Sequence, residues 1–321
     1  MTVTEGWTRS VLPSVGTDPA TTTEQSPERW RRSAQALIDS LSVPRRSEHA
    51  AGGKPAASSG GALAAVLATL LRADIPVLVA PDLIESLRPA PPPAGGWTGS
   101  ARSTEATAVT LYALSMLGQP AEPGTLLDLS GGTVTTAAGH DSPATGARLL
   151  DALGAAGDGR RYYEVAAARR RISTWLCDRQ RPDGSWHDPR HASPYFTTAN
   201  CVLALHDSGV GARASAAVLR AVDWVLRTQH PDGSWGLHHG TATETAYALQ
   251  ILLATTDPPS ARMSRAAGHG AVHLTRAAAT QVPAPRPEPE LDPYRPVARA
   301  GIIVAGHLAQ QTTAGDLPRQ A

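Results

Sequence analysis

Two kinds of apolar segment alternate along the chain after about residue 100. The first kind is apolar nearly all round its helical projection and follows a Ser, Thr or Asp that can cap a helix, as near residues 103, 141, 193 and 241. The second kind, 161–179 and 211–228, keeps its charged residues on one face. Because a wholly apolar helix lies in an interior and a one-faced helix lies at a surface, a period of about 40–50 residues predicts an all-α, α/α barrel. A curled solenoid that does not close is the alternative.

One seven-residue pattern occurs twice, where these segments meet. Gln-x-Pro-Asp-Gly-Ser-Trp ends at Trp186 and again at Trp235, and each copy follows a helical segment that carries Trp175 or Trp224. Pro ends the helix, Asp-Gly supplies the turn, and the Gln amide can bond groups left open at a helix end. The pattern therefore indicates a structural clasp between helices.

The first part of the chain has a different composition. Residues 1–26 show no periodicity, 27–41 have the pattern of a short helix, and a Gly-, Ser- and Pro-rich stretch follows. We expect two regions: an N-terminal tail, short helix and linker at 1–59, and a single barrel domain at 60–321.

Bulk composition narrows the class of protein. A formal net charge of +1 gives no indication of a nucleic-acid partner or an anionic membrane surface. The two cysteines, Cys177 and Cys201, have no metal-like spacing and are too few for a disulfide framework. The sequence shows no secretory signal pattern and no run of 18 apolar residues, so we expect a cytoplasmic protein without an integral membrane segment.

Four segments together resemble one enzyme family. The two Gln-to-Trp clasps resemble the repeats of squalene-hopene cyclases, which are built on an α/α barrel. Residues 186–198, Trp-His-Asp-Pro-Arg-His-Ala-Ser-Pro-Tyr-Phe-Thr-Thr, resemble the Asp-Lys-Trp-His-Ala-Ser-Pro-Tyr-Tyr-x-Thr stretch of bacterial class II diterpene cyclases of the copalyl diphosphate synthase type. Residues 240–247 resemble their Gly-Thr-Ala-Glu-Glu-Thr-Ala-Tyr, and Tyr-Arg-Pro-Val at 294–297 resembles their C-terminal segment. The resemblance covers about residues 160–310.

The chain departs from this family at the proton donor. Class II cyclases protonate an alkene with the middle Asp of Asp-x-Asp-Asp-Thr-Ala, whereas the corresponding place here reads Asp141-Ser-Pro-Ala-Thr-Gly, with Pro143 in the middle. A neutral, acidic carboxyl needs a second carboxylate nearby, which Asp141 lacks. Asp141 is therefore either a helix cap or a functional group at the cavity mouth. Family members also carry a further N-terminal helical domain, and we expect a single barrel here.

The resemblance also implies candidate site residues. It places His191 and Tyr195 in the active site, to bond the substrate or relay a proton, and Glu244 at the cavity mouth. The structural alternatives are a buried His bonded to a loop carbonyl, a packing Tyr, and a Glu that interacts with the helix dipole. Arg190 is the candidate for diphosphate contact. The aromatic candidates for substrate contact, with clasp or core packing as the alternative, are Trp97, Trp186 and Tyr247.

The predicted function is that of a terpene-cyclase-like enzyme that cyclises a polyprenyl diphosphate, or a related prenyl or polyene intermediate, by a departure from the usual Asp-x-Asp-Asp protonation. The alternative is an inactive barrel that binds a hydrophobic small molecule or scaffolds a partner enzyme. No cofactor is expected, except Mg²⁺ if a diphosphate is bound. A cavity of several hundred Å³ with His191 and Glu244 pointing inward would favour catalysis, and a filled core would favour the inactive barrel.

Overall fold

The computed structural model describes residues 27–42, 58–88, 101–119, 121–131, 142–156, 161–255, 260–280 and 295–314. These residues form helices and no strands. The helices are α1 (Pro27–Ser42), α2 (Ser58–Arg72), α3 (Pro81–Ser86), α4 (Ala101–Met116), α5 (Pro123–Gly131), α6 (Pro143–Gly154), α7 (Tyr162–Asp178), α8 (Pro194–Ser208), α9 (Ala212–Arg227), α10 (Ala242–Ala254), α11 (Ala261–Thr280) and α12 (Arg295–Ala314).

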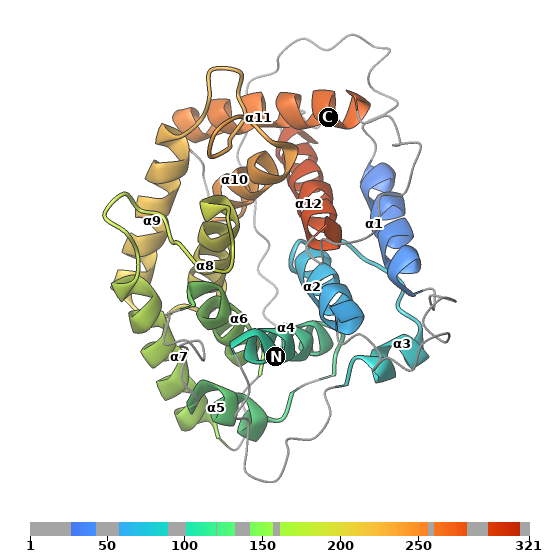
Figure 1. The fold of residues 1–321 in the computed structure, drawn as a ribbon, viewed down its shortest axis with the longest axis vertical. Coiled ribbons are helices and arrows are strands. Elements are labelled where there is room, and N and C mark those ends of the chain that lie inside the picture. Colours follow the sequence, from blue (N-terminus) through green and yellow to red (C-terminus); the bar gives the residue numbers. More distant parts are fainter. Residues whose placement is uncertain are drawn as a thin grey trace, which may run out of the picture.

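The even-numbered helices form a closed inner ring (Figure 1). Each packs on the next, in the order α2, α4, α6, α8, α10 and α12, and α12 packs back on α2. The helices α1, α5, α7, α9 and α11 lie outside this ring and pack on it. The α/α barrel predicted from the sequence is confirmed, and the open solenoid is wrong.

Burial separates the two rings as the hydrophobic pattern predicts. Every residue of α6 from Pro143 to Leu153 is buried, and α8 and α10 are buried along most of their lengths. In contrast, α9 buries one face only, through Ala214, Ala217 and Val218 and the residues one and two turns further on. The inner helices run parallel, because an outer helix returns the chain between successive inner ones. Their N-terminal ends therefore share one mouth of the barrel.

The two clasps have nearly identical geometry. Trp186 Nε1 donates to Leu176 O at 2.8 Å, and Trp235 Nε1 donates to Val225 O at 2.8 Å, so each indole bonds the last turn of the preceding outer helix. Gln180 Nε2 donates to Gly184 O and also to Ala217 O of the next outer helix, both at 2.8 Å. Gln229 repeats this pattern with Gly233 O and Ala266 O. The predicted clasp is confirmed: it fixes successive outer helices to each other.

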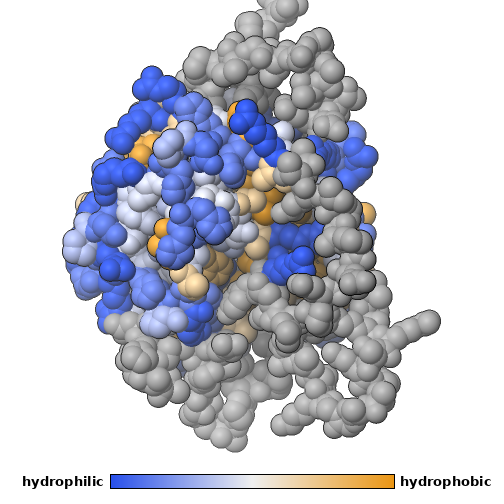
Figure 2. Space-filling model, turned by 45° about the horizontal axis from the view of Figure 1, so that its top comes forward, coloured by the Kyte–Doolittle hydropathy of each residue, from blue (hydrophilic) through white to orange (hydrophobic). Residues whose placement is uncertain are grey.

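The N-terminal helix belongs to the outer layer. α1 packs on α2 and α12, and its Trp30 ring lies so close to Gly306 that a Cβ there would fall 2.3 Å from the ring. Residues 1–26 lie outside the described residues, and the domain boundary at 59/60 stays a prediction. Most of the described surface in the view of Figure 2 is hydrophilic, with hydrophobic residues near the centre of the view. None of the described helices combines the length and the apolar character that a membrane span requires.

Candidate functional site

Charged residues gather at the mouth where α4, α6 and α8 begin. We name this group the mouth cluster and define it as Glu105, Ser142, Thr145, Asp188, Arg190 and His191. Glu105 lies in the first turns of α4, and Ser142 is the N-cap of α6, with its Oγ accepting from Thr145 N at 3.3 Å. The other three charged or titratable members come from the loop that precedes α8.

Asp188 is the centre of the mouth cluster. Its carboxylate is fully buried and accepts from Ser142 Oγ at 2.7 Å, from Arg190 N at 2.9 Å and from Ala144 N at 3.3 Å. The last bond ties it to the first turn of α6, where the helix dipole favours a negative charge. Burial by itself would raise the pKa of Asp188, but the bonds from Arg190 and Ser142 outweigh it and lower the pKa below its usual range. Asp188 is therefore an anion at neutral pH.

Arg190 joins this carboxylate to a second one. Its guanidinium lies 2.7 Å from Glu105 Oε2 and 3.3 Å from Asp188 Oδ2, and it donates to Thr145 Oγ1 at 3.0 Å and to Ser142 Oγ. Two negative charges thus surround one positive charge. A ligand anion that approaches Arg190 has to displace Glu105 or bind alongside it.

His191 lies beneath this ion-paired layer. Its ring is buried, with Nε2 4.0 Å from Glu105 Oε1 and its centroid 4.5 Å from the ring of Phe196. Burial lowers the pKa of His191 below its usual value, although Glu105 and Asp188 oppose the shift. A neutral imidazole beside Phe196 can accept or donate a hydrogen bond, but it lacks the second ring proton that an imidazolium acid would give up.

Two further predicted residues, Tyr195 and Glu244, lie outside the mouth cluster. The Tyr195 ring packs on Trp224 of α9 at 4.6 Å, so it lies between α8 and the outer ring. Glu244 accepts from Ser193 Oγ at 2.9 Å and from Thr241 Oγ1 at 3.0 Å, which locks the loop before α8 to the start of α10. Neither of them lines the axial cavity described below, and a catalytic role for either stays a prediction.

Of the four remaining predicted residues, the structure describes Trp186 and Tyr247 but not Asp141 and Trp97. Trp186 is fully buried in its clasp and does not line the axial cavity, whereas Tyr247 lines it. Asp141 and Trp97 lie outside the described residues, so their roles stay predictions. The N-cap of α6 is Ser142, so the prediction that Asp141 caps this helix is wrong, and only its role at the cavity mouth stays a prediction.

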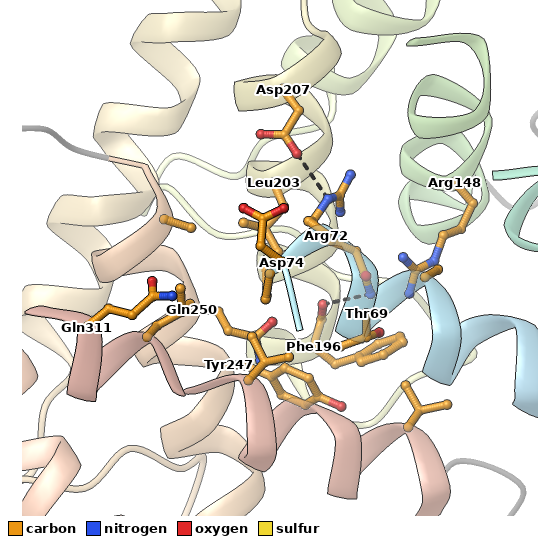
Figure 3. Close-up of a pocket in the computed structure, with 18 residues that line it drawn as sticks. Thr69, Arg72, Asp74, Arg148, Phe196, Leu203, Asp207, Tyr247, Gln250 and Gln311 are labelled. Carbon is orange, nitrogen blue, oxygen red and sulfur yellow. Dashed lines mark hydrogen bonds and ion pairs between the residues drawn. The ribbon is translucent and has the colours of Figure 1, made fainter. Parts of the chain in front are cut away.

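An axial cavity of about 160 Å³ runs along the inside of the ring (Figure 3). Phe196 and Tyr247 lie at its inner end, which is the end nearer the starts of α8 and α10, with their rings edge to face at 5.4 Å. Asp207 and Gln311 lie towards the C-terminal ends of the inner helices. Its apolar wall includes Leu203, Val304 and Leu308. The volume is below the range of about 300–1,000 Å³ that is usual for ligand pockets.

The polar side of this cavity holds a buried ion-pair network. The Arg72 guanidinium bonds Asp151 on one side, lies 3.0 Å from Asp207 on the other, and stacks on the Tyr112 ring at 5.1 Å. Burial raises the pKa of Asp151, and Arg72 and Arg148 oppose that shift only in part. Arg148 is also buried and lines the cavity, and its NH1 lies 3.7 Å from Asp151 Oδ2.

Sequence reasoning missed four members of the mouth cluster: the carboxylates Glu105 and Asp188 and the hydroxyl residues Ser142 and Thr145. Glu105 had a usable signal, because Thr104-Glu105 stands near the start of α4 as Thr243-Glu244 stands near the start of α10. Asp188 lies within the segment that resembles the cyclases, but no local pattern indicates that its carboxylate reaches the start of α6. Within the described residues, no group of three or more His, Cys, Asp or Glu side chains is arranged to hold a metal ion.

Residues 136–275 match the squalene-hopene cyclase C-terminal domain family. The chain is 35% identical over 202 residues to ent-copalyl diphosphate synthase from Streptomyces sp. (strain KO-3988), a match that covers 61% of this chain and 39% of that protein. It is 38% identical over 197 residues to labda-7,13-dienyl diphosphate synthase from Streptomyces clavuligerus, covering 59% of this chain and 35% of the relative. The chain thus spans well under half the length of these curated relatives.

Solved structures agree with these matches. Ent-copalyl diphosphate synthase from Streptomyces platensis superposes with a TM-score of 0.63 at 34% identity, covering 80% of this chain and 50% of that one. The type II terpene cyclase MstE from Scytonema superposes with a TM-score of 0.56 over 89% of this chain and 99% of its own. At 15% identity, that second likeness shows the fold alone.

The barrel, its clasps and these matches define the chain as a relative of the class II terpene cyclases. Within that class, its homologues are the bacterial diterpene cyclases of the copalyl diphosphate synthase type. The resemblance predicted from the sequence is confirmed.

Proposed function

We propose that the chain acts on a polyprenyl diphosphate, or on a related prenyl or polyene intermediate, and that it cyclises this ligand without proton donation by an Asp-x-Asp-Asp carboxyl. The relatives named above support the substrate class. Phe196 and Tyr247 support it further, because aromatic faces stabilise the carbocations that arise in such cyclisations.

The observation that carries this departure is the charge state of the mouth cluster. By the resemblance to the family motif, Pro143 takes the place of the acid. The buried carboxylate beside it, Asp188, is held ionised by Arg190 and Ser142. An alkene needs a strong neutral acid, which a hydrogen-bonded carboxylate with a lowered pKa does not provide. Among the described residues of the mouth, Asp188 and Arg190 thus form an ion pair, and Asp188 is not suited to donate a proton.

Arg190 is the group we propose for contact with the diphosphate. Its planar guanidinium suits phosphate oxygens, and it is 17% exposed at the mouth. Because Glu105 lies 2.7 Å from it, the diphosphate must compete with that carboxylate. Mg²⁺ carried by the diphosphate would reduce the repulsion between the two anions.

The test is incubation of the purified chain with geranylgeranyl diphosphate, with and without Mg²⁺, followed by dephosphorylation and gas chromatography–mass spectrometry. We expect a cyclic product from the wild type, a loss of it in Arg190→Met, and a reduction in Glu244→Gln. Arg171→Met on α7 is the matched control, because Arg171 bonds Ser130 of α5, and both helices lie outside the inner ring. Recovery of unchanged substrate under every condition contradicts catalysis on this substrate.

A second candidate is a non-catalytic barrel that binds a hydrophobic small molecule or scaffolds a partner enzyme. The small volume of the axial cavity and the paired charges of the mouth cluster favour it. Calorimetric binding of geranylgeranyl diphosphate without any conversion supports this candidate over the first.

A further inference from the structure

Arg148 is a buried arginine that lines the axial cavity and makes no hydrogen bond among the described residues. Only 6% of the residue is exposed, and its side chain extends from α6 towards Thr69 and Phe196 (Figure 3). Among the described residues its one charged contact is with Asp151, at 3.7 Å, which is too long for a hydrogen bond. A buried guanidinium carries five N–H donors and normally uses most of them.

The neighbouring carboxylates are already engaged by another arginine. Asp151 and Asp207 bond Arg72 from its two sides, so the negative charge near Arg148 is shared with Arg72. Asp74 also lines the cavity, but it is exposed at the rim. No hydrogen bond from the Arg148 guanidinium is found among the described residues, so it presents N–H donors into the cavity.

Apolar side chains from α8 and α12 also line the cavity. Leu203, Val304 and Leu308 line it, with the rings of Phe196 and Tyr247 at the inner end. The volume of about 160 Å³ compares with the roughly 150 Å³ apolar cavity that holds benzene in an engineered protein. Such a space accommodates an apolar body of about six carbons.

We propose that the axial cavity binds a small amphiphilic monocarboxylate, with its two oxygens on Arg148 and its hydrocarbon body against the wall of Leu203, Val304 and Leu308. A single guanidinium pairs with one carboxylate in bidentate geometry. A dianionic phosphate would meet stronger repulsion from Asp151 and Asp207. This binding requires neither a polyprenyl chain nor a cyclisation, and it leaves the mouth cluster unoccupied.

The test compares hexanoate with its neutral analogue hexan-1-ol by isothermal titration calorimetry and ligand-observed NMR on the full chain. We expect hexanoate to bind at least about tenfold more tightly than hexan-1-ol, because a charge-assisted bond is lost in the alcohol. Arg148→Met should weaken hexanoate at least about tenfold and leave hexan-1-ol unchanged. Asp207→Asn should strengthen hexanoate several-fold, because it removes a competing anion.

Two controls separate the charge from the shape of the site. Leu203→Phe narrows the cavity and should weaken both ligands, whereas Arg171→Met on α7 should change neither. If Arg148→Met does not fold, Asp207→Asn and the salt dependence of wild-type hexanoate binding still decide the question. Equal affinity for the two ligands, an unchanged affinity in a folded Arg148→Met, or no binding of hexanoate at millimolar concentrations each overturns the proposed site.

Discussion

Replacement of Asp188 by Asn tests how the mouth cluster is held together. The side chain is fully buried, and the change keeps its shape while it removes the charge that faces Arg190 and the first turn of α6. Loss of one partner of a buried ion pair costs about 3–5 kcal/mol. Arg190 keeps Glu105 at 2.7 Å and is partly exposed, so we expect Asp188→Asn to lower the free energy of unfolding by about 2–4 kcal/mol.

The assay is urea unfolding at pH 7, followed by far-ultraviolet circular dichroism and tryptophan fluorescence, with the free energy taken from the midpoint and slope. Asp183→Asn is the matched control in the same loop, because Asp183 is exposed and Asn can still accept from Ser185 N. We expect less than about 1 kcal/mol there. If Asp188→Asn costs no more than Asp183→Asn, the carboxylate does not hold the mouth cluster and the reasoning is refuted.

Three other substitutions test separate parts of the structure. In the wild type, His191 should lower the stability of the folded state as the pH falls below about 6.5, because its pKa is lowered in the folded state and the unfolded chain takes up the proton first. The measurement compares the urea midpoints of the wild type and His191→Gln at pH 7.5 and at pH 5. If the difference between the two proteins is the same at both pH values, this prediction is contradicted. Trp235→Phe removes the bond to the buried Val225 carbonyl and should cost about 1–3 kcal/mol in urea unfolding, and no loss would show that the clasp bond is dispensable. Gly184→Ala should lower the unfolding midpoint more than Gly211→Ala, since both have positive φ but only at Gly184 would a Cβ fall 2.4 Å from a backbone oxygen; equal effects would rule out that contact.

The sequence predicted the architecture because two independent patterns agree on it. Apolar segments behind Ser or Thr caps gave the inner helices, and the repeated Gln-to-Trp pattern gave the connections between outer helices. Both are local signals that recur along the chain. Closure of the ring was the less certain part, because it depends on α12 packing on α2, two helices that lie far apart along the chain.

The candidate site was less predictable for a geometric reason. Tyr195 and Phe196 are neighbours in α8, yet one packs on the outer helix α9 and the other lines the axial cavity. Successive helix positions point about 100° apart, so a motif does not indicate which of two adjacent aromatics faces inward in a helix that is buried all round. Arg148 was missed because a single Arg within an apolar helix shows no pattern.

The most direct test of the central claim is the geranylgeranyl diphosphate incubation carried out in D₂O, with the deuterium content of any cyclic product measured by mass spectrometry. A carboxyl that protonates an alkene exchanges with solvent and leaves one solvent-derived deuterium in each product molecule. We predict a cyclic product without that deuterium, because the buried carboxylate beside Pro143 is held as an anion. The carbocation would then form by departure of the diphosphate with the electrons of its allylic C–O bond, and the cyclised cation would lose a proton to give the product. A cyclic product that forms only in the presence of the enzyme and carries one solvent-derived deuterium contradicts the account.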